Sequence, residues 1–331
     1  MSKIVPTRFN PGAAWVLHIM RGPRRLRTRH GHGRRRRTGR TTRHLGLACA
    51  IALLALGGCT QAPVTEAGPP AQPPAAAISA QAAVAAEVAR LQADLMREVP
   101  QAIPPDPVSD RVWIALAKQR LAASAVVIDQ AQVIVVVDRN PRVQQLRIIA
   151  AQPADGPWSV IGGSKVSTGQ AGRRGYFITP TGVFPHLTDI LDYRALGTFN
   201  ENHIRGLGRK GMRVWDFGWQ TAEKGWQPDH ETGEIRLLVH ATDPDYLEQR
   251  LGHPASKGCI RVPASMNRFL DFHGILDADY ERAAAQDARL AEILLPDRRP
   301  TELAGRLLVV VDSSPDSAEA SVRLGGRTAG R

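Results

Sequence analysis

The chain of 331 residues carries 43 lysines and arginines against 31 aspartates and glutamates, a formal net charge of +12. Residues 1–58 hold 13 of the basic residues and none of the acidic ones, so the rest of the chain is close to neutral. The length suffices for one or two domains with a buried core. The charge distribution excludes the broad basic surface that nucleic-acid binding requires, so no nucleic-acid partner is expected.

Residues 1–58 have the pattern of a signal peptide, with an arginine-rich stretch that ends at Arg43 and an apolar stretch that begins at Leu45. The apolar stretch is shorter than the roughly 20 residues that a membrane-spanning helix needs. Met20 is an alternative start. The ending Leu56-Gly57-Gly58-Cys59 resembles a bacterial lipobox, which implies a lipoprotein acylated at Cys59.

The residue after the lipobox cysteine is Thr60 rather than aspartate. By the same resemblance, the expected location is the periplasm, on a lipid anchor in the outer membrane. The alternative is cleavage elsewhere and a soluble product. Residues 59–78 are rich in proline and alanine, which predicts an extended tether or a disordered linker, and the composition does not choose between them.

Residues 79–123 are predicted to be helical. Apolar residues recur at spacings of four, three and four in residues 79–99, and Pro100 ends this helix. A second helix is predicted over residues 110–122, with Ser109 as its N-cap. Its inward-facing residues are predicted to be Val112, Leu116 and Ala117.

Residues 124–312 are predicted to form a mainly β domain. Runs of β-branched residues between turn signals predict the strands 132–138, 143–151, 158–167, 182–186, 235–239 and 306–312. The first two of these form a predicted hairpin. The run 190–220 is glycine- and asparagine-rich and is predicted to be a loop, while residues 263–273 and 280–294 are predicted helices. Residues 313–331 are predicted to be a disordered tail.

The chemistry is predicted at residues 240–261. His240 ends a buried strand, and Cys259 follows in a glycine-containing turn. Folded back on each other, these two residues make a thiol nucleophile with a general base. Cys259 is the sole cysteine after Cys59, so it has no intramolecular disulfide partner in an oxidising compartment. No zinc-peptidase spacing is present, and no metal or other cofactor is expected.

His240, a gap of 15 residues and then Ser256-Lys257-Gly258-Cys259-Ile260-Arg261 resemble the signature of the L,D-transpeptidase (YkuD-type) catalytic domain family. Two upstream segments, 166–169 and 179–184, resemble further segments of the same family. Lys257 stands where the family has a second histidine. The resemblance implies a curved mixed sheet or β-sandwich with a few helices, preceded here by the helical segment.

The resemblance also implies an activity. Peptidoglycan stem peptides would be the substrate, and an acyl group would pass through the cysteine to form a 3→3 crosslink or to attach or exchange another acceptor. The alternatives are an L,D-carboxypeptidase or amidase, in which water accepts the acyl group, and a catalytically silent peptidoglycan-binding lipoprotein. The motif is compatible with each of these acceptors.

The residues around the pair have expected roles. In the family, the backbone carbonyl of the residue after the histidine orients its ring, so the resemblance implies this role for Ala241. The amides of Gly258 and Cys259 would form an oxyanion hole. The other predicted substrate-binding residues are Ser256, Lys257 and Arg261. Arg261 either holds a substrate carboxylate or braces the loop.

Several side chains near the motif have two interpretations. Lys257 either favours the thiolate and pairs with an anionic stem peptide or is a solvated lysine. His253 substitutes for the missing histidine or is incidental. Trp215, Phe217 and Trp219 either form an aromatic wall of the cleft or pack in the core.

Overall fold

The computed structural model describes residues 75–153 and 156–315. The predicted signal peptide, the lipobox with Cys59 and the tail from residue 316 onward lie outside these residues, as does most of the predicted tether. Among the helices that the structure describes, none is long and apolar enough to cross a bilayer.

Two mixed sheets form the centre of the molecule. The first has the strand order β3-β2-β1-β9-β4, in which β1 and β9 run parallel and the other neighbours antiparallel. Its strands are β1 (Gln132–Asp138), β2 (Gln145–Ala151), β3 (Ser159–Lys165), β4 (Gly182–Pro185) and β9 (Leu307–Val311). The predicted hairpin is confirmed as the antiparallel pair of β1 and β2.

The second sheet has the order β5-β6-β7-β8, with only β7 and β8 parallel. Its strands are β5 (Tyr193–Arg194), β6 (Arg213–Glu223), β7 (Thr232–Ala241) and β8 (Ile260–Val262). The prediction that residues 190–220 form only a loop is therefore wrong. Asp216 and Arg213 interrupt the apolar pattern of β6, and both are buried because each has an oppositely charged partner.

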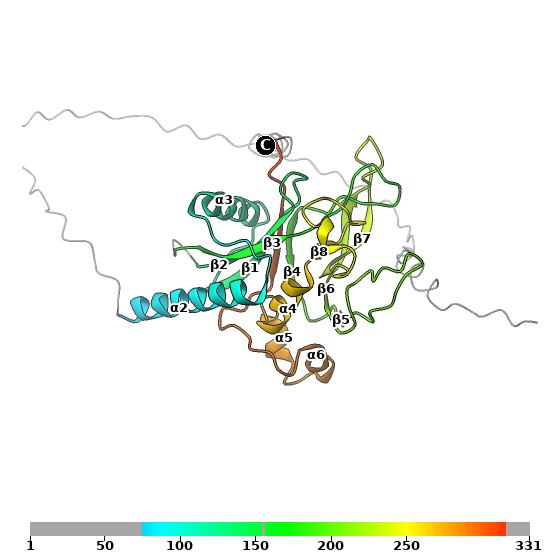
Figure 1. Cartoon of the computed structure of the whole chain (residues 1–331). Helices are drawn as coiled ribbons and strands as arrows, with labels where there is room; N and C mark the ends of the chain where they lie inside the picture. The colour runs from blue at the N-terminus through cyan, green and yellow to red at the C-terminus, as the bar shows by residue number, and fades with distance from the viewer. Residues whose placement is uncertain (1–74, 154–155, 316–331) are drawn as a thin grey trace, which may run out of the picture. The chain divides into compact units, whose positions relative to one another are not determined.

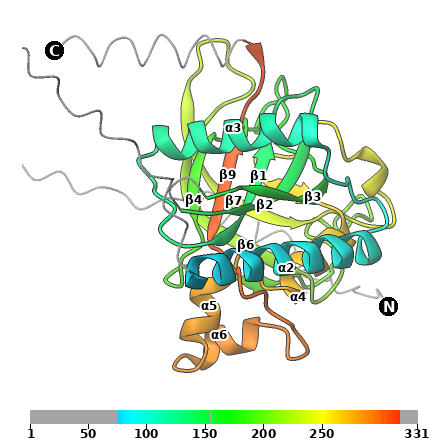
Figure 2. The ribbon, with the colours of Figure 1, turned by 90° about the vertical axis from the view of Figure 1, so that its left-hand side faces the viewer.

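Side chains on opposite faces of β1 enter two different cores. Val133, Val135 and Val137 join the second sheet, α2 (Ala75–Glu98) and α4 (Ala264–Phe272) in the larger core. Ile134 and Val136 face the other way and pack against α3 (Pro107–Ala123). Figures 1 and 2 show the first sheet between α3 on one side and α2 on the other. The predicted mainly β fold with mixed sheets and a few helices is confirmed.

The amino-terminal helices are confirmed, with corrections at α3. Its N-cap is Asp106, whose side chain accepts a hydrogen bond from the Ser109 amide at 2.9 Å, and Pro107 begins the helix. Ser109 is thus inside the first turn and is not the cap. Val112 is 56% exposed, so its predicted inward orientation is wrong. The buried residues of this helix are Trp113, Ala117 and Leu121.

The helix predicted over residues 280–294 is two helices. They are α5 (Ala278–Ala283) and α6 (Ala288–Ile293), which pack together through Tyr280, Leu290 and Leu294. The turn between them ends at Asp287, whose side chain caps α6 by accepting from the Arg289 amide. The predicted helix ran through Asp287 without a break. Aspartate favours the N-cap position, and Asp287 therefore starts a second helix.

Candidate active site

The register of β7 and β8 places His240 and Cys259 on one face of the second sheet. Val239 lies opposite Ile260, and His240 lies opposite Arg261. Val239 and Ile260 are fully buried in the core, and side chains alternate along a strand. His240 and Arg261 therefore face away from that core, and so does Cys259, which precedes Ile260. The structure brings the three predicted residues together.

A β-bulge in β6 separates the aromatic residues that pack in the core from the one that borders the site. Trp215 and Phe217 alternate into the core and are buried. The register then shifts between Asp216 and Trp219, where Gly218 has a φ of 75°. One extra residue moves the following side chain to the opposite face, so Trp219 lies opposite Arg236 on the Cys259 face and is 41% exposed. Trp215 and Phe217 are core residues, and only Trp219 borders the site.

The turn that carries the cysteine is held by Ser256. Its hydroxyl donates to the carbonyl of Cys259 at 2.5 Å and accepts from the amide of Gly258 at 3.0 Å. Ser256 is buried, so both bonds are shielded from water. The Gly258 amide is consequently engaged inside the turn, contrary to its expected role as an oxyanion donor. The amide of Cys259 remains the candidate donor.

Gly258 is required by the shape of this turn. Its φ is 130°, and an added Cβ would lie 2.9 Å from Cδ1 of Ile235 and 3.5 Å from Cβ of Phe177. A side chain here would therefore meet both an unfavourable backbone conformation and a packed wall.

Thr179, which sequence reasoning did not include among the site residues, links the two motifs. Its hydroxyl accepts from the amide of Gly169 and donates to the carbonyl of Gly258, both at 2.8 Å. The upstream segment also pairs with the cysteine loop through backbone bridges between Ser167 and Arg261 and between Gly169 and Ser256. The order of these motifs along the sequence was a signal that the two segments belong to one site.

His240 is arranged as a neutral base. Its Nδ1 lies 2.8 Å from the carbonyl oxygen of Ala241, the contact that the resemblance implies. Because a carbonyl only accepts, Nδ1 carries the proton and Nε2 keeps its lone pair. Burial, together with the positive charge of Arg261, lowers the pKa of His240 to about 4. The ring is therefore uncharged at neutral pH.

Cys259 is a protonated thiol in the resting site. Burial raises its pKa, while the backbone of Leu238 and the charge of Arg261 lower it in part. Its Sγ donates to the carbonyl of Arg236 at 3.7 Å. Within residues 75–153 and 156–315, no hydrogen bond joins Sγ to His240. Rotation about the side-chain torsion of Cys259 would redirect the thiol, and catalytic hydrogen bonds are often formed only with substrate present.

Arg261 is the principal charge beside the pair. Its Nη1 donates to the carbonyl of Ala255 at 3.3 Å, and its buried Nε has no hydrogen-bond partner within the described residues. Burial lowers its pKa, and Cys259 and Tyr176 raise it in part. A buried guanidinium with an unused donor is the type of group that binds a carboxylate. The loop-bracing role is also present, through Ala255.

Lys257 and His253 point to solvent. Both are exposed, and Lys257 Nζ lies 5.8 Å from the centroid of the Tyr176 ring. Lys257 is not among the groups that shift the pKa of Cys259. Asp243, which follows His240 in the sequence, accepts from the amides of Arg205 and Asp245. The solvated-lysine interpretation of Lys257 fits these contacts better.

The described residues contain two groups whose side chains are close enough to share a metal ion. These are Asp94, Glu98 and His273, and His186, Asp192 and Asp277. Neither group contains a motif residue. Arginines already pair with carboxylates in both groups, namely Arg97 in the first and Arg213 in the second.

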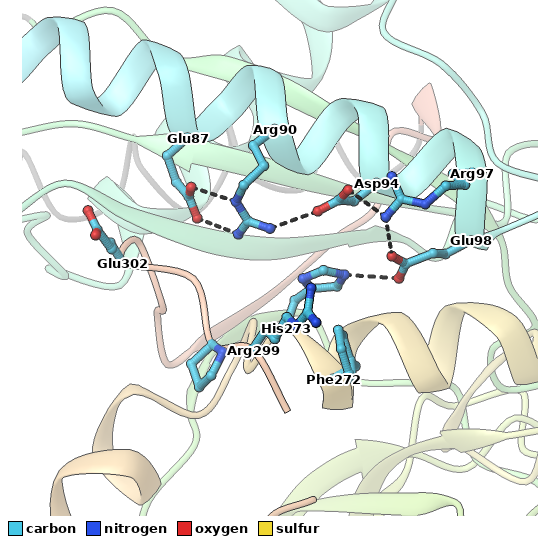
Figure 3. A pocket seen from close by; sticks show the side chains of 10 residues that line it. Glu87, Arg90, Asp94, Arg97, Glu98, Phe272, His273, Arg299 and Glu302 are labelled. Atoms are coloured by element: carbon cyan, nitrogen blue, oxygen red, sulfur yellow. Dashed lines mark hydrogen bonds and ion pairs between the residues drawn. The ribbon is translucent and has the colours of Figure 1, made fainter. Parts of the chain in front are cut away.

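Outside the motif, α2, the end of α4 and the segment that follows α6 line a pocket, which Figure 3 shows. Its volume is about 720 Å³. The charged side chains that α2 contributes are joined in a chain of ion pairs, which continues to His273. Arg90 pairs with both Glu87 and Asp94, and Nε2 of His273 lies 2.9 Å from Glu98. These ion pairs hold the exposed side of α2 together, and none of the residues that line the pocket belongs to the predicted site.

No family model and no curated protein matches this chain. One solved structure with a match is a fused Zn-dependent amidase/peptidase/peptidoglycan-binding domain-containing protein from Clostridium acetobutylicum. It shares 14% identity with a TM-score of 0.24, over 62% of this chain and 64% of that one. The chain thus spans less than two thirds of that structure, and a likeness of this size carries no argument about fold or activity.

Proposed function

We propose that the protein is a peptidoglycan L,D-transpeptidase that acts through an acyl-enzyme on Cys259. The observation that carries the proposal is that His240, in β7, and Cys259, directly before β8, lie on one face of the second sheet, with the Nδ1 proton of His240 fixed by Ala241. A thiol on the same face of the sheet as a neutral imidazole supports nucleophilic attack with proton transfer.

In the proposed first step, the Cys259 thiol turns toward Nε2 of His240 and attacks the carbonyl of the diamino-acid residue in a tetrapeptide stem. The thiol proton passes to Nε2 as the carbon–sulfur bond forms. The Cys259 amide stabilises the oxyanion, and Arg261 holds a substrate carboxylate. The carbon–nitrogen bond to the terminal D-Ala then breaks, and His240 returns the proton to its amine.

The second proposed step is the reverse sequence with a new amine. The side-chain amine of another stem attacks the thioester, His240 accepts its proton, and Cys259 leaves and is reprotonated. The product is a 3→3 crosslink. A lipoprotein or a free D-amino acid as acceptor gives an anchored protein or an exchanged stem, and water gives the tripeptide of an L,D-carboxypeptidase.

The low pKa of His240 is consistent with its proposed role as the base that accepts the thiol proton. An imidazole that is charged at rest cannot accept the thiol proton, whereas a neutral one can throughout the range above pH 4. Burial of Cys259 keeps the thiol protonated, so we propose that the thiolate forms only as the substrate is attacked. The location that we propose is the periplasm, on a lipid anchor at Cys59.

The test is product analysis after incubation with disaccharide-tetrapeptide. Mass spectrometry of the wild-type reaction is expected to show a crosslinked dimer and free D-Ala, and Cys259→Ala is expected to show neither. Tripeptide without dimer would assign the carboxypeptidase instead. Untouched tetrapeptide with both proteins would assign the silent peptidoglycan-binding lipoprotein, which the change of the family histidine to Lys257 favours.

A matched pair of histidine variants separates a catalytic effect from a general one. His240→Ala is expected to lower product formation by about 10²- to 10⁴-fold, because proton transfer is lost. His253→Ala, which changes an exposed histidine 13 residues along the chain, is expected to leave it unchanged.

A further inference from the structure

We propose that the guanidinium of Arg236 is a second carboxylate-binding group of this site, on the opposite side of Cys259 from Arg261, and that it binds a carboxylate of the peptide acyl donor. The inference rests on the proposed function, because it specifies the substrate of the same site. It assigns a role to three residues outside the motif, namely Arg236, Asp216 and Trp219.

Strand pairing places these residues in successive rows on the Cys259 face. One row holds Trp219 beside Arg236, and the next row holds Asp216 beside Leu238. Cys259 lies one position before Ile260, the neighbour of Val239, and so stands beside Leu238.

The third row holds Val214, His240 and Arg261. Rows two residues apart are separated by about 7 Å. The Cys259 row therefore lies between an Arg236 row and an Arg261 row.

The thiol already lies close to the Arg236 end of this arrangement. Its hydrogen bond goes to the carbonyl of Arg236 at 3.7 Å. Tyr193 borders the same face from β5, opposite Val214, and is partly exposed. Burial, together with the negative charge of Asp216, raises the pKa of Tyr193 to about 12, so its hydroxyl is neutral.

Asp216 fixes the guanidinium by one edge. Nε of Arg236 donates to Oδ2 of Asp216 at 2.7 Å, and Asp216 is 2% exposed. The second oxygen of Asp216 accepts from the amide of Gly218, the bulge residue. The carboxylate is thus held by the backbone of the bulge and in turn holds the arginine.

The other edge of the guanidinium is free to bind. The Arg236 side chain is 37% exposed, and within residues 75–153 and 156–315 its two terminal nitrogens have no hydrogen-bond partner. The exposed Trp219 ring stands 6.0 Å from the guanidinium carbon and limits its movement. Two parallel N–H donors in one plane match the two oxygens of a carboxylate.

The alternative role of Arg236 is to neutralise the buried Asp216. That role uses Nε alone, and the ammonium group of a lysine would also perform it. It does not require the arginine to stand exposed beside the reactive thiol. A substrate with carboxylates on both sides of the scissile bond is the ligand that two arginines flanking the thiol fit.

The experiment measures the response of an Arg236 variant to individual carboxylates of the donor. The proteins are the purified full chain, Arg236→Gln and the double variant Arg236→Gln/Asp216→Asn, which removes both charges if the single variant does not fold. Arg268→Gln is the matched control, because Arg268 is an exposed arginine on α4 that pairs with Asp297. The donors are a tetrapeptide stem and forms of it in which one carboxylate at a time is an amide.

The readout is kcat/KM for release of the terminal D-Ala. With the unmodified donor, the Arg236 variant is expected to lose about 10- to 100-fold, the range of a hydrogen-bonded charge pair. With one particular amidated donor, wild type and variant are expected to react equally, and this identifies the carboxylate bound. A loss of equal size with every donor, or no loss with any, overturns the proposal.

Failure of the proposed function has a separate signature. If wild type releases no D-Ala, binding of the unmodified tetrapeptide to Cys259→Ala and to Cys259→Ala/Arg236→Gln is measured by calorimetry. A dissociation constant that is about 10- to 100-fold higher in the second protein supports the Arg236 site on a protein without this activity. Equal dissociation constants, or no binding to either protein, overturn it.

Discussion

Two equally buried histidines lie in opposite electrostatic surroundings. His186, which follows β4, has Nδ1 2.9 Å from the Leu276 carbonyl and Nε2 3.0 Å from Asp192, so both nitrogens donate and the ring is an imidazolium. Burial lowers its pKa, but Asp192 and Asp277 more than offset that effect and the net shift is upward. His240 has one carbonyl and no carboxylate, and its pKa falls to about 4.

The arginines beside these histidines differ in the same way. Arg213 is fully buried and pairs with Asp192, Asp271 and Asp277. Arg261 is partly buried and leaves its Nε without a partner in the described part of the chain. Burial alone therefore does not distinguish a structural charge from a functional one. Arg213 and Arg261 differ in the number of their protein partners, and an arginine whose donors are all used inside the fold has none left for a substrate.

The largest expected effect of a single substitution on stability is at Arg213, which pairs with three buried aspartates. Arg213→Met would leave the Asp192 and Asp277 carboxylates buried without their main partner. A loss of about 3–5 kcal/mol in the free energy of unfolding is expected, measured by urea denaturation. Arg282→Met, which removes an exposed ion pair with Asp279, is the control and is expected to change it by less than about 1 kcal/mol. Equal effects of the two variants would contradict the comparison.

The two histidines are expected to give opposite pH dependences of stability. His240 has a lowered pKa, so the unfolded state binds its proton first and stability falls as pH drops from about 6.5 to about 4, by about 3 kcal/mol in total. His186 has a raised pKa, so its contribution is present below pH 6.5 and is lost as pH rises through the folded value.

These slopes are isolated by comparing variants with wild type across pH. The difference in unfolding free energy between wild type and His240→Gln is expected to shrink toward acid, between pH 6.5 and 4. The difference for His186→Gln is expected to shrink toward base, above pH 6.5. Slopes of the same sign for both histidines would show that their surroundings do not differ as described.

A smaller effect is expected at the turn that holds the nucleophile. Ser256→Ala removes the hydroxyl that bonds the Gly258 amide and the Cys259 carbonyl. It is expected to lower the unfolding free energy by about 1–3 kcal/mol and to slow product formation as well, because Cys259 is no longer fixed. Ser265→Ala on α4, where the hydroxyl makes no hydrogen bond within the described residues, is the matched control. Full activity of Ser256→Ala would remove Ser256 from the site.

The smallest effect is expected at Lys257. Because this lysine is exposed and contacts Tyr176, Lys257→His and Lys257→Ala are each expected to change the rate of Cys259 alkylation by less than about fivefold at neutral pH. The rate of iodoacetamide labelling measures this directly. A tenfold slower reaction in Lys257→Ala would restore the interpretation in which the lysine favours the thiolate.

The elements with a strong local pattern could be predicted from the sequence. The valine-rich run 132–138 coincides with β1, and the apolar spacing of Val88, Leu91 and Leu95 gives the buried face of α2. The bulge at Gly218 could not be predicted, because only the pairing with β7 reveals the extra residue. That bulge is the reason why Trp219 faces the site while Trp215 lies in the core.

The charged residues of β6 were missed for a related reason. Arg213 and Asp216 have the local character of loop residues, and their partners are 20 to 64 positions away in the sequence. The candidate nucleophile Cys259 and base His240 could be predicted from the sequence, because both belong to one short motif. The supporting residue Thr179 belongs to a predicted segment, but its bond to Gly258 spans 79 positions and required the fold.

The most direct test of the central claim is detection of the acyl-enzyme itself. Intact-protein mass spectrometry after brief mixing with the tetrapeptide donor is expected to show one adduct with the mass of the tripeptide acyl group, located at Cys259 by peptide mapping. Cys259→Ala is expected to show no adduct, and His240→Ala to accumulate it at least about 100-fold more slowly. Consumption of the tetrapeptide at the same rate by Cys259→Ala, or an adduct on another residue, would contradict the account.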